Sequence, residues 1–220
     1  VLLAHGWSSH GTRFQAWVAR LREAGYAVVA FDQPAHGRSD GRHSNLLEFV
    51  HTLAAVARHF GPSALVVGHS LGGAAVAVAM ARGLQAERAV LIAPAADPVA
   101  AAQRFARFVG LPMRLCRQMI AGFETVVGTS FDEFQAQHNA PRIAHPALIV
   151  HDLADREVPW EEGERYARYW HDSRLLSTQG LGHNRIVADD AVIAATLRFL
   201  RGRPVGERVV STPNLPYGIA

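Results

Sequence analysis

The sequence predicts a doubly wound α/β domain, in which helices cover both faces of a mostly parallel sheet. Short, almost continuously apolar runs alternate along the chain with longer amphipathic stretches, as expected when strands are buried on both faces. The 220 residues are 49% hydrophobic and 19% charged, which is typical of a globular protein. A chain of this length buries roughly 70–75% of its unfolded surface and needs no disulfide or metal to fold.

Six apolar runs are predicted strands. They cover residues 1–4, 27–31, 64–67, 89–92, 147–151 and 174–178, and the last is the least apolar. Five amphipathic stretches are predicted helices, at residues 13–23, 46–59, 72–82, 160–170 and 190–200. Gly25 follows the first helix and Gly61 the second, as is typical of helix ends.

A stretch of about fifty residues between Pro94 and Pro146 breaks this alternation, because it shows helical periodicity and no strand. Pro112 is expected to kink or split its first helix, and a second short helix is predicted at residues 131–139. The stretch is either extra packing or a cap over an active site, and its position favours the cap. One apolar face would carry Phe105, Phe108, Leu111, Leu115 and Met119.

The predicted organisation therefore has three parts. Residues 1–94 and 146–201 form the core, and residues 95–145 form a helical cap insertion. Residues 202–220 are rich in proline and are expected to form an extended, poorly packed tail.

The composition excludes or disfavours several classes of protein. All 22 basic residues are arginine, so a Walker A lysine, a Schiff-base lysine and a serine–lysine dyad are impossible. The net charge is +3, but the arginines are scattered, so we expect no nucleic-acid partner. No apolar run approaches the roughly 18 residues of a membrane-spanning helix. The single cysteine, Cys116, fits a reducing compartment, which favours a cytoplasmic location without excluding others.

The strongest chemical signal is Gly68-His69-Ser70-Leu71-Gly72, between a predicted strand and a predicted helix. A serine on so sharp a turn has a strained backbone and presents its Oγ above the sheet edge. Glycine is needed two positions before and after the serine, because a Cβ there would collide with the neighbouring turn. The pattern in this context predicts a nucleophile elbow, with the His69 side chain pointing away from Ser70.

Over residues 1 to about 201, the chain resembles the α/β-hydrolase family. The matching motifs, in the family's order, are His5-Gly6-Trp7, residues 32–39 (DQPAHGRS), the elbow, residues 151–159 (HDLADREVP) and Gly180-Leu181-Gly182-His183. The resemblance implies the strand order 27–31, 1–4, 64–67, 89–92, 147–151 and 174–178. The family's first two strands are missing, so the strand at residues 27–31 would be an uncovered edge, and we expect the natural chain to begin before Val1.

The resemblance also implies a catalytic triad of Ser70, Asp155 and His183. A serine hydroxyl needs a base, and an imidazole can both accept and return its proton, while a carboxylate orients the ring. Other carboxylates compete with Asp155 for the role of the acid, although only Asp155 has the family's spacing to Val158-Pro159. These rivals are Asp152, Glu157 and Asp97, the last of which resembles a helix N-cap.

Three further sets of residues have expected roles. The backbone N–H groups of Trp7 and Leu71 correspond to the family's oxyanion hole. Asp32 and Ser39 are expected to shape a tight loop rather than to catalyse. Candidate residues of an apolar substrate pocket are Trp7, Phe105, Phe108, Met113 and Met119.

A metal site is not predicted, because His151, Asp152 and Asp155 have no fourth ligand at a typical spacing. No organic cofactor is implied. Cys116 falls in the cap helix and is interpreted as a packing residue.

These residues predict a serine hydrolase that cleaves a carboxylic ester of a small to medium hydrophobic substrate through an acyl-enzyme, with a small-molecule acyl compound as its partner. The same triad serves thioesterases, lactonases, amidases, acyltransferases and carbon–carbon bond hydrolases, and these alternatives stay open. Haloalkane dehalogenases and epoxide hydrolases are disfavoured, because their nucleophile is an aspartate where this chain has Ser70. Outside enzymes, the alternative is a non-catalytic ligand-binding protein on the same scaffold. The oligomeric state is not predicted.

Overall fold

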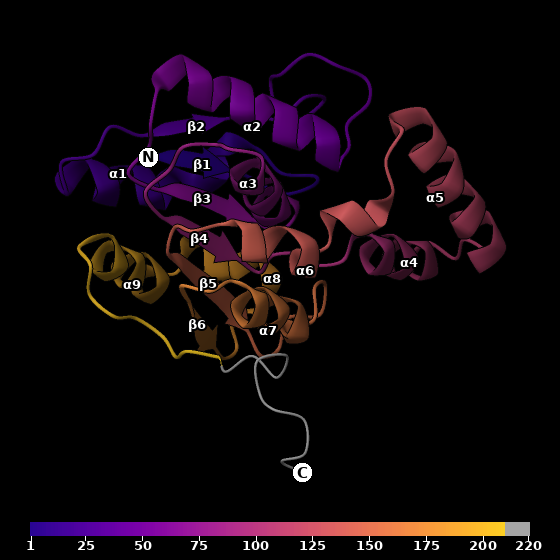
Figure 1. The fold of residues 1–220 in the computed structure, drawn as a ribbon. Helices are drawn as coiled ribbons and strands as arrows, with labels where there is room; N and C mark the ends of the chain where they lie inside the picture. The colour runs from indigo at the N-terminus through magenta and orange to yellow at the C-terminus, as the bar shows by residue number, and fades with distance from the viewer. Residues whose placement is uncertain (210–220) are drawn as a thin grey trace, which may run out of the picture.

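The computed structural model describes residues 1–209, which form a six-stranded sheet with helices on both faces (Figure 1). The strand order is β2-β1-β3-β4-β5-β6, and every neighbouring pair is parallel. The predicted fold class and strand order are therefore confirmed. The strands are β1 (Leu2–Ala4), β2 (Val29–Phe31), β3 (Val66–His69), β4 (Ala89–Ile92), β5 (Ala147–Asp152) and β6 (Ser173–Thr178).

Nine α-helices and four short 3₁₀ helices occupy the described residues. The α-helices are α1 (Gln15–Glu23), α2 (Leu46–Phe60), α3 (Leu71–Ala81), α4 (Pro98–Phe108), α5 (Met113–Val127), α6 (Ala136–Asn139), α7 (Trp160–Tyr169), α8 (Gly182–Arg185) and α9 (Asp190–Leu200). The 3₁₀ helices are η1 (Gly11–Phe14), η2 (Phe131–Phe134), η3 (Ala140–Arg142) and η4 (Ile186–Ala188).

Each face of the sheet has its own apolar core. Leu3 and Val67 pack with α1 and α9 on one face, whereas Leu2 and Val66 pack with α2, α3 and α7 on the other. Successive strand residues point to opposite faces, and here both faces are covered. This explains why the strands read as continuous apolar runs rather than as alternating patterns.

Two elements near the amino terminus differ from their predicted bounds. The helix predicted at residues 13–23 begins as η1 and continues as α1. The strand predicted at residues 27–31 is shorter, since β2 covers only Val29–Phe31; Val29 N–H donates to Val1 O at 2.9 Å, and Ala27 O accepts from the Val1 amino group at 2.8 Å. Tyr26 N donates to Leu21 O and closes the end of α1 just before this pairing begins.

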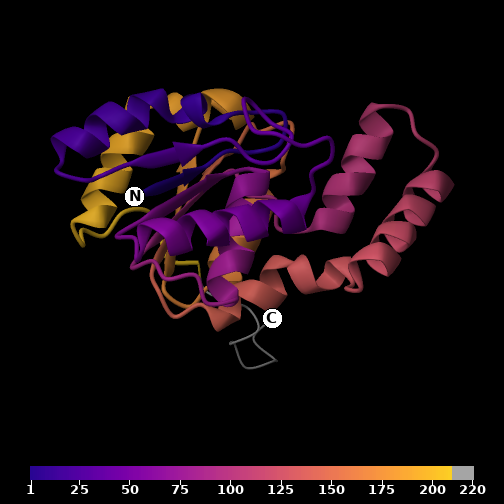
Figure 2. The ribbon, with the colours of Figure 1, turned by 90° about the horizontal axis from the view of Figure 1, so that it is seen from above.

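The insertion between β4 and β5 begins with a helical hairpin made of α4 and α5. Asp97 caps α4 by accepting a hydrogen bond from Ala100 N at 3.0 Å, and Pro112 separates α4 from α5 as predicted. Gly128 ends α5 in the left-handed conformation, with φ of 72°. Figure 2 shows the hairpin projecting away from the sheet, so most of its surface is not covered by the core. Its function as a cap stays a prediction.

The rest of the insertion returns to the sheet through short helices. The helix predicted at residues 131–139 is divided into η2 and α6, because Gln135 between them is extended. Asn139 closes this segment by donating to the carbonyl oxygens of Glu133 and Gln135.

A buried carboxylate on α7 fastens the base of the hairpin to the core. Glu162 Oε2 accepts hydrogen bonds from Ala96 N (2.6 Å) and Asp97 N (3.0 Å). Its Oε1 accepts one from Arg104 Nη1 at 2.8 Å. Because Glu162 is only 4% exposed, these charge-assisted bonds fix where α4 leaves the sheet.

The described part of the tail is mostly exposed, but it is attached to the sheet at one point. Glu207 exchanges two backbone hydrogen bonds of 2.8 Å with Leu175 in β6, whose edge offers free backbone groups for pairing, and Val205 is buried. The extended, poorly packed tail as a whole stays a prediction. The remainder of the predicted tail, residues 210–220, lies outside the described residues. Among the described helices, none is long and apolar enough to cross a membrane.

Candidate active site

Ser70 occupies the sharp turn between β3 and α3. Its φ is 54° and its ψ is −121°, a conformation that side-chain-bearing residues rarely adopt. The turn is held by Ser70 N, which donates to Ile92 O at 2.9 Å, and by Gly73 N, which donates to Ser70 O at 2.9 Å. The backbone strain expected of a nucleophile elbow is thus present at this residue.

The glycines around Ser70 are required by close backbone contacts. A Cβ on Gly68 would lie 2.4 Å from Gly72 O, and a Cβ on Gly72 would lie 2.4 Å from Ala4 O and from His5 O. Neither backbone can move aside, because both belong to the central strands or to the helix start. The steric reason given for the glycine spacing therefore holds.

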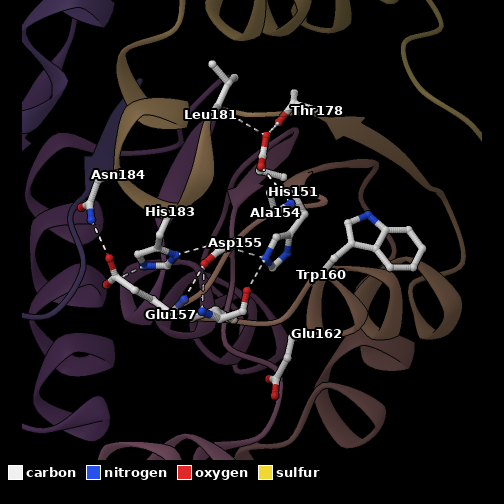
Figure 3. A network of polar contacts seen from close by, with 12 residues as sticks. His151, Ala154, Asp155, Glu157, Trp160, Glu162, Thr178, Leu181, His183 and Asn184 are labelled. Carbon is white, nitrogen blue, oxygen red and sulfur yellow. Dashed lines mark hydrogen bonds and ion pairs between the residues drawn. The ribbon is translucent and has the colours of Figure 1, made fainter. Parts of the chain in front are cut away.

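Asp155 lies in the loop after β5 and is aimed at His183 (Figure 3). Its Oδ1 accepts hydrogen bonds from Glu157 N (2.9 Å) and Val158 N (3.0 Å), which fix the carboxylate plane. Its Oδ2 lies 2.7 Å from Nδ1 of His183. The side chain is fully buried. Burial alone would raise the pKa of this carboxyl group, but hydrogen bonds from His151 and His183 hold it well below its usual range, so Asp155 is ionised.

His183 is oriented by that carboxylate. Because a carboxylate only accepts, Nδ1 of His183 carries the proton, which leaves the lone pair of Nε2 available. Nε2 lies 4.0 Å from Oε2 of the exposed Glu157, whose Oε1 is held by Asn184 Nδ2 at 2.6 Å. Within the described residues, Ser70 Oγ forms no hydrogen bond, to His183 or to any other group. Such bonds are often long in a site without substrate.

The three rival carboxylates have other partners. Asp97 caps α4, and Glu157 approaches the Nε2 side of the imidazole rather than Nδ1. Asp152 is fully buried and accepts hydrogen bonds through Oδ2 from Thr178 Oγ1 (2.7 Å) and Leu181 N (2.9 Å). Only Asp155 therefore meets the imidazole at Nδ1 among the described residues.

Asp152 joins the loop of the acid to the loop of the base. Besides its contacts to Thr178 and Leu181, its Oδ1 accepts from Ala154 N at 3.0 Å. Burial opposes the charge, but these hydrogen bonds and one from Gly182 N keep the pKa of Asp152 below its ordinary value. The carboxylate thus fixes the backbone just before His183. Sequence reasoning considered Asp152 as a catalytic rival and as a metal ligand but not in this structural role, since hydrogen bonds between distant loops leave no local signal.

His69, expected to point away from Ser70, lies against the ring of His183. Its Nε2 lies 3.0 Å from His183 O, and the two ring centroids are 4.7 Å apart. Burial and, to a smaller extent, the neighbouring His183 together lower the pKa of His69 to about 3, so the ring is neutral at physiological pH.

Two backbone N–H groups near Ser70 have no acceptor. Neither Trp7 N nor Leu71 N donates a hydrogen bond within the described residues. A Cβ on Gly6 would lie 2.8 Å from Ser70 Cβ, so the loop that carries Trp7 rests directly on the elbow. Trp7 therefore follows a residue that contacts Ser70, and Leu71 is the residue after Ser70; their role as oxyanion donors stays a prediction.

His5 fixes the loop of Trp7. Its Nδ1 donates to Gly6 O at 2.7 Å, and its Nε2 accepts from Gln33 N at 2.9 Å. Trp7 is 52% exposed and stacks on Phe49, with ring centroids 6.4 Å apart. The indole consequently offers an apolar surface beside the predicted oxyanion donors.

The remaining pocket candidates lie on the hairpin and are open to solvent. Phe105, Phe108 and Met119 are 61%, 87% and 60% exposed, and Met113 is half-buried. The structure places them on the projecting helices, and their contact with substrate stays a prediction. Cys116, in contrast, is buried, as expected of a packing residue.

Asp32 shapes the loop after β2, as predicted. Its carboxylate accepts from Gly11 N (2.6 Å) and Arg38 N (2.8 Å), and its carbonyl oxygen accepts from Ser39 Oγ at 2.7 Å. A search of residues 1–209 finds no group of three or more side chains arranged to hold a metal ion.

Comparisons with known proteins agree with this geometry. The chain is similar to the monoacylglycerol lipase of Mycolicibacterium smegmatis, with 39% identity over 84 residues, which are 34% of this chain and 30% of that protein. It is 31% identical over 137 residues to the non-heme haloperoxidase of Rhodococcus erythropolis, covering 61% of this chain and 48% of that protein. The chain thus spans about a third to a half of the length of these curated relatives.

Solved structures give a fuller match. The monoacylglycerol lipase of Paleococcus ferrophilus superposes with a TM-score of 0.71 at 25% identity, covering 91% of this chain and 93% of that chain. Fold and motifs together define an α/β hydrolase. The family model described as "Serine aminopeptidase, S33" matches residues 1–125, and the chain belongs to this family.

Proposed function

We propose that the protein is a serine hydrolase that cleaves carboxylic esters of small to medium hydrophobic substrates through an acyl-enzyme. The observation that carries the proposal is the 2.7 Å contact between Asp155 Oδ2 and His183 Nδ1, in a loop that packs against the residue preceding Ser70. A carboxylate in this position selects the tautomer in which Nε2 can accept a proton.

Ser70 is the proposed nucleophile. As its Oγ attacks the ester carbonyl carbon, His183 Nε2 takes the hydroxyl proton, and the buried charge of Asp155 stabilises the resulting imidazolium. The same proton then passes to the leaving alcohol, which leaves the acyl group on Ser70 Oγ. Water, deprotonated by His183, attacks that acyl group; the bond to Ser70 Oγ breaks, His183 returns the proton to Oγ, and the acid is released.

The N–H groups of Trp7 and Leu71 are the proposed donors to the developing oxyanion. Both amides lack an acceptor among residues 1–209, so their hydrogen-bonding capacity is available when the carbonyl oxygen becomes negative. Backbone donors held by His5 and by the start of α3 need little rearrangement in the transition state.

Exposed apolar side chains support the proposal of a hydrophobic acyl group. Trp7 stands next to the proposed oxyanion donors, and the α4–α5 hairpin carries the exposed Phe105 and Phe108. A bound acyl chain would remove these surfaces from water, which favours binding in proportion to the area buried. The monoacylglycerol lipase matches are consistent with such a substrate.

The proposal is tested by turnover of p-nitrophenyl acetate, butyrate and octanoate by the wild type and by Ser70→Ala. We expect ester turnover that Ser70→Ala abolishes, and covalent labelling of Ser70 by a fluorophosphonate. Ser63→Ala, a buried serine outside the site, is the matched control and should keep full activity. Full turnover in Ser70→Ala would contradict the proposal. Adding thioester and lactone substrates to the same screen tests the thioesterase and lactonase alternatives.

A further inference from the structure

The elbow and the loop of the base are joined by His69, the last residue of β3. His69 immediately precedes Ser70, and its side chain, with only 3% of the residue exposed, reaches across to the backbone of His183. The Nε2 atom of His69 lies 3.0 Å from the carbonyl oxygen of His183. Among the described residues, Ser70 Oγ makes no hydrogen bond. The contact between His69 and His183 O is therefore the polar link between the elbow and the loop of the base.

The contact fixes the tautomer of His69. A carbonyl oxygen only accepts, so Nε2 of His69 must carry the proton and donate it. Nδ1 is then unprotonated, and it is buried without a hydrogen-bond partner among the described residues. It faces the loop of Gly6, where an added Cβ would lie 3.4 Å away. Burying Nδ1 without a hydrogen-bond partner costs free energy. The hydrogen bond donated by Nε2 is the polar contact that offsets part of this cost.

The imidazole of His183 is consequently held from two directions. Asp155 binds its Nδ1 at 2.7 Å, which sets the rotation of the ring. His69 binds its backbone carbonyl and packs against the ring, with centroids 4.7 Å apart at an interplanar angle of 43°. The first contact orients the ring, whereas the second ties its position to the residue next to Ser70.

We propose that His69 is a positioning residue that sets the separation between Ser70 Oγ and His183 Nε2 through its hydrogen bond to the His183 carbonyl. It touches neither substrate nor the transferred proton, and acts only through the backbone of the base. The inference rests on the proposed hydrolase function. Because burial lowers the pKa of His69 to about 3, the ring adds no positive charge beside His183 when that residue is protonated.

Two substitutions separate the hydrogen bond from the packing. His69→Gln keeps an N–H donor at a similar reach, while His69→Phe keeps an aromatic ring and removes the donor. A misplacement of roughly 1 Å in a catalytic group lowers the rate by about 100-fold. We therefore expect kcat of His69→Phe to fall by about 10- to 100-fold with KM within about threefold, and His69→Gln to recover most of kcat.

A matched control removes a buried donor elsewhere. Asn139→Ala deletes two hydrogen bonds to backbone carbonyls in the α6 segment, so it should lower stability and leave kcat per folded molecule unchanged. The folded fraction of every variant is measured by urea denaturation. If His69→Phe does not fold, His69→Leu removes the same donor with a smaller side chain. Equal kcat in the wild type, His69→Gln and the variant without a donor would overturn the proposal.

A second readout does not depend on turnover. The Nδ1 proton of His183, observed by NMR and assigned with His183→Asn, reports the contact with Asp155. Its chemical shift should move in His69→Phe and return in His69→Gln, and an unmoved shift in both would overturn the positioning role. If the wild type does not hydrolyse esters, the proposed function fails, and this NMR comparison still decides whether His69 sets the position of His183.

Discussion

Oδ2 of Asp155 lies 3.4 Å from Nε2 of His151, on the side away from His183. His151 is fully buried, and the same Nε2 lies 2.9 Å from Val158 O. Both neighbours are acceptors, so Nε2 of His151 carries a proton and shares it between them. The carboxylate of Asp155 thus lies between two imidazoles, which helps to keep it charged without access to water.

Replacing Asp155 with asparagine should sharply lower the rate of ester hydrolysis. The amide cannot stabilise the imidazolium and favours the wrong tautomer of His183, so we expect kcat to fall by about 10⁴-fold. The measurement is kcat for p-nitrophenyl butyrate. Asp97→Asn is the matched control, because asparagine caps a helix about as well as aspartate. A loss of less than tenfold in Asp155→Asn would contradict the assigned role.

Acid should unfold the protein partly through Asp152. Its folded-state pKa is lower than in the unfolded chain, where an aspartate titrates near 3.9, so its contribution is present above about pH 4 and is lost as the pH falls below that value. Asp152→Asn should therefore be less stable at pH 7, by roughly 1–3 kcal/mol, and should lose less stability on acidification. Urea denaturation between pH 7 and pH 2.5 measures both effects. The exposed Asp40→Asn serves as the control, and parallel stability curves for the wild type and Asp152→Asn would refute the prediction.

The two glycine substitutions Gly68→Ala and Gly122→Ala should have opposite effects. A methyl group on Gly68 meets backbone at 2.4 Å, so we expect a loss of roughly 1–3 kcal/mol or a failure to fold. Gly122 lies within α5 with nothing inside 4 Å, so alanine there should add about 0.5–1 kcal/mol. Free energies of unfolding from urea denaturation test both signs, and a neutral Gly68→Ala would show that the elbow tolerates a side chain.

The hairpin should influence chain-length preference. Each methylene buried against Phe105 and Phe108 contributes about 0.8 kcal/mol, so losing two such contacts lowers kcat/KM about tenfold. We expect the ratio of kcat/KM for octanoate to that for acetate to fall by about this factor in Phe105→Ser/Phe108→Ser. Val126→Ser, which is as exposed as Phe108 and lies near the end of α5, is the control. An unchanged ratio in the double variant would show that the hairpin does not contribute to binding the acyl chain.

The sheet was predictable because its strands are buried on both faces. Residues 89–92, for example, form β4 with the predicted bounds. A short, continuous apolar run between helices is buried most readily as a central strand that is covered on both faces. The elbow was predictable for a different reason, as glycine at 68 and 72 is a local requirement of the turn around Ser70.

The polar contacts that hold the site were not predictable. Asp152 reaches Leu181, and His69 reaches His183 across 114 positions of sequence. Such contacts depend on how loops meet after folding, and a histidine or aspartate has the same sequence pattern whether it is buried or exposed. Glu162 is similar, because nothing in the sequence around it marks the contact with the start of α4 that buries it.

The left-handed backbone of Ser70 has a consequence for how the protein can change. A residue with a side chain in this conformation costs roughly 1–3 kcal/mol, which glycine would largely relieve. Under the proposed function, Ser70→Gly therefore exchanges activity for stability. Random mutagenesis screened only for heat resistance should enrich glycine at this position, whereas a screen that also demands turnover should eliminate it.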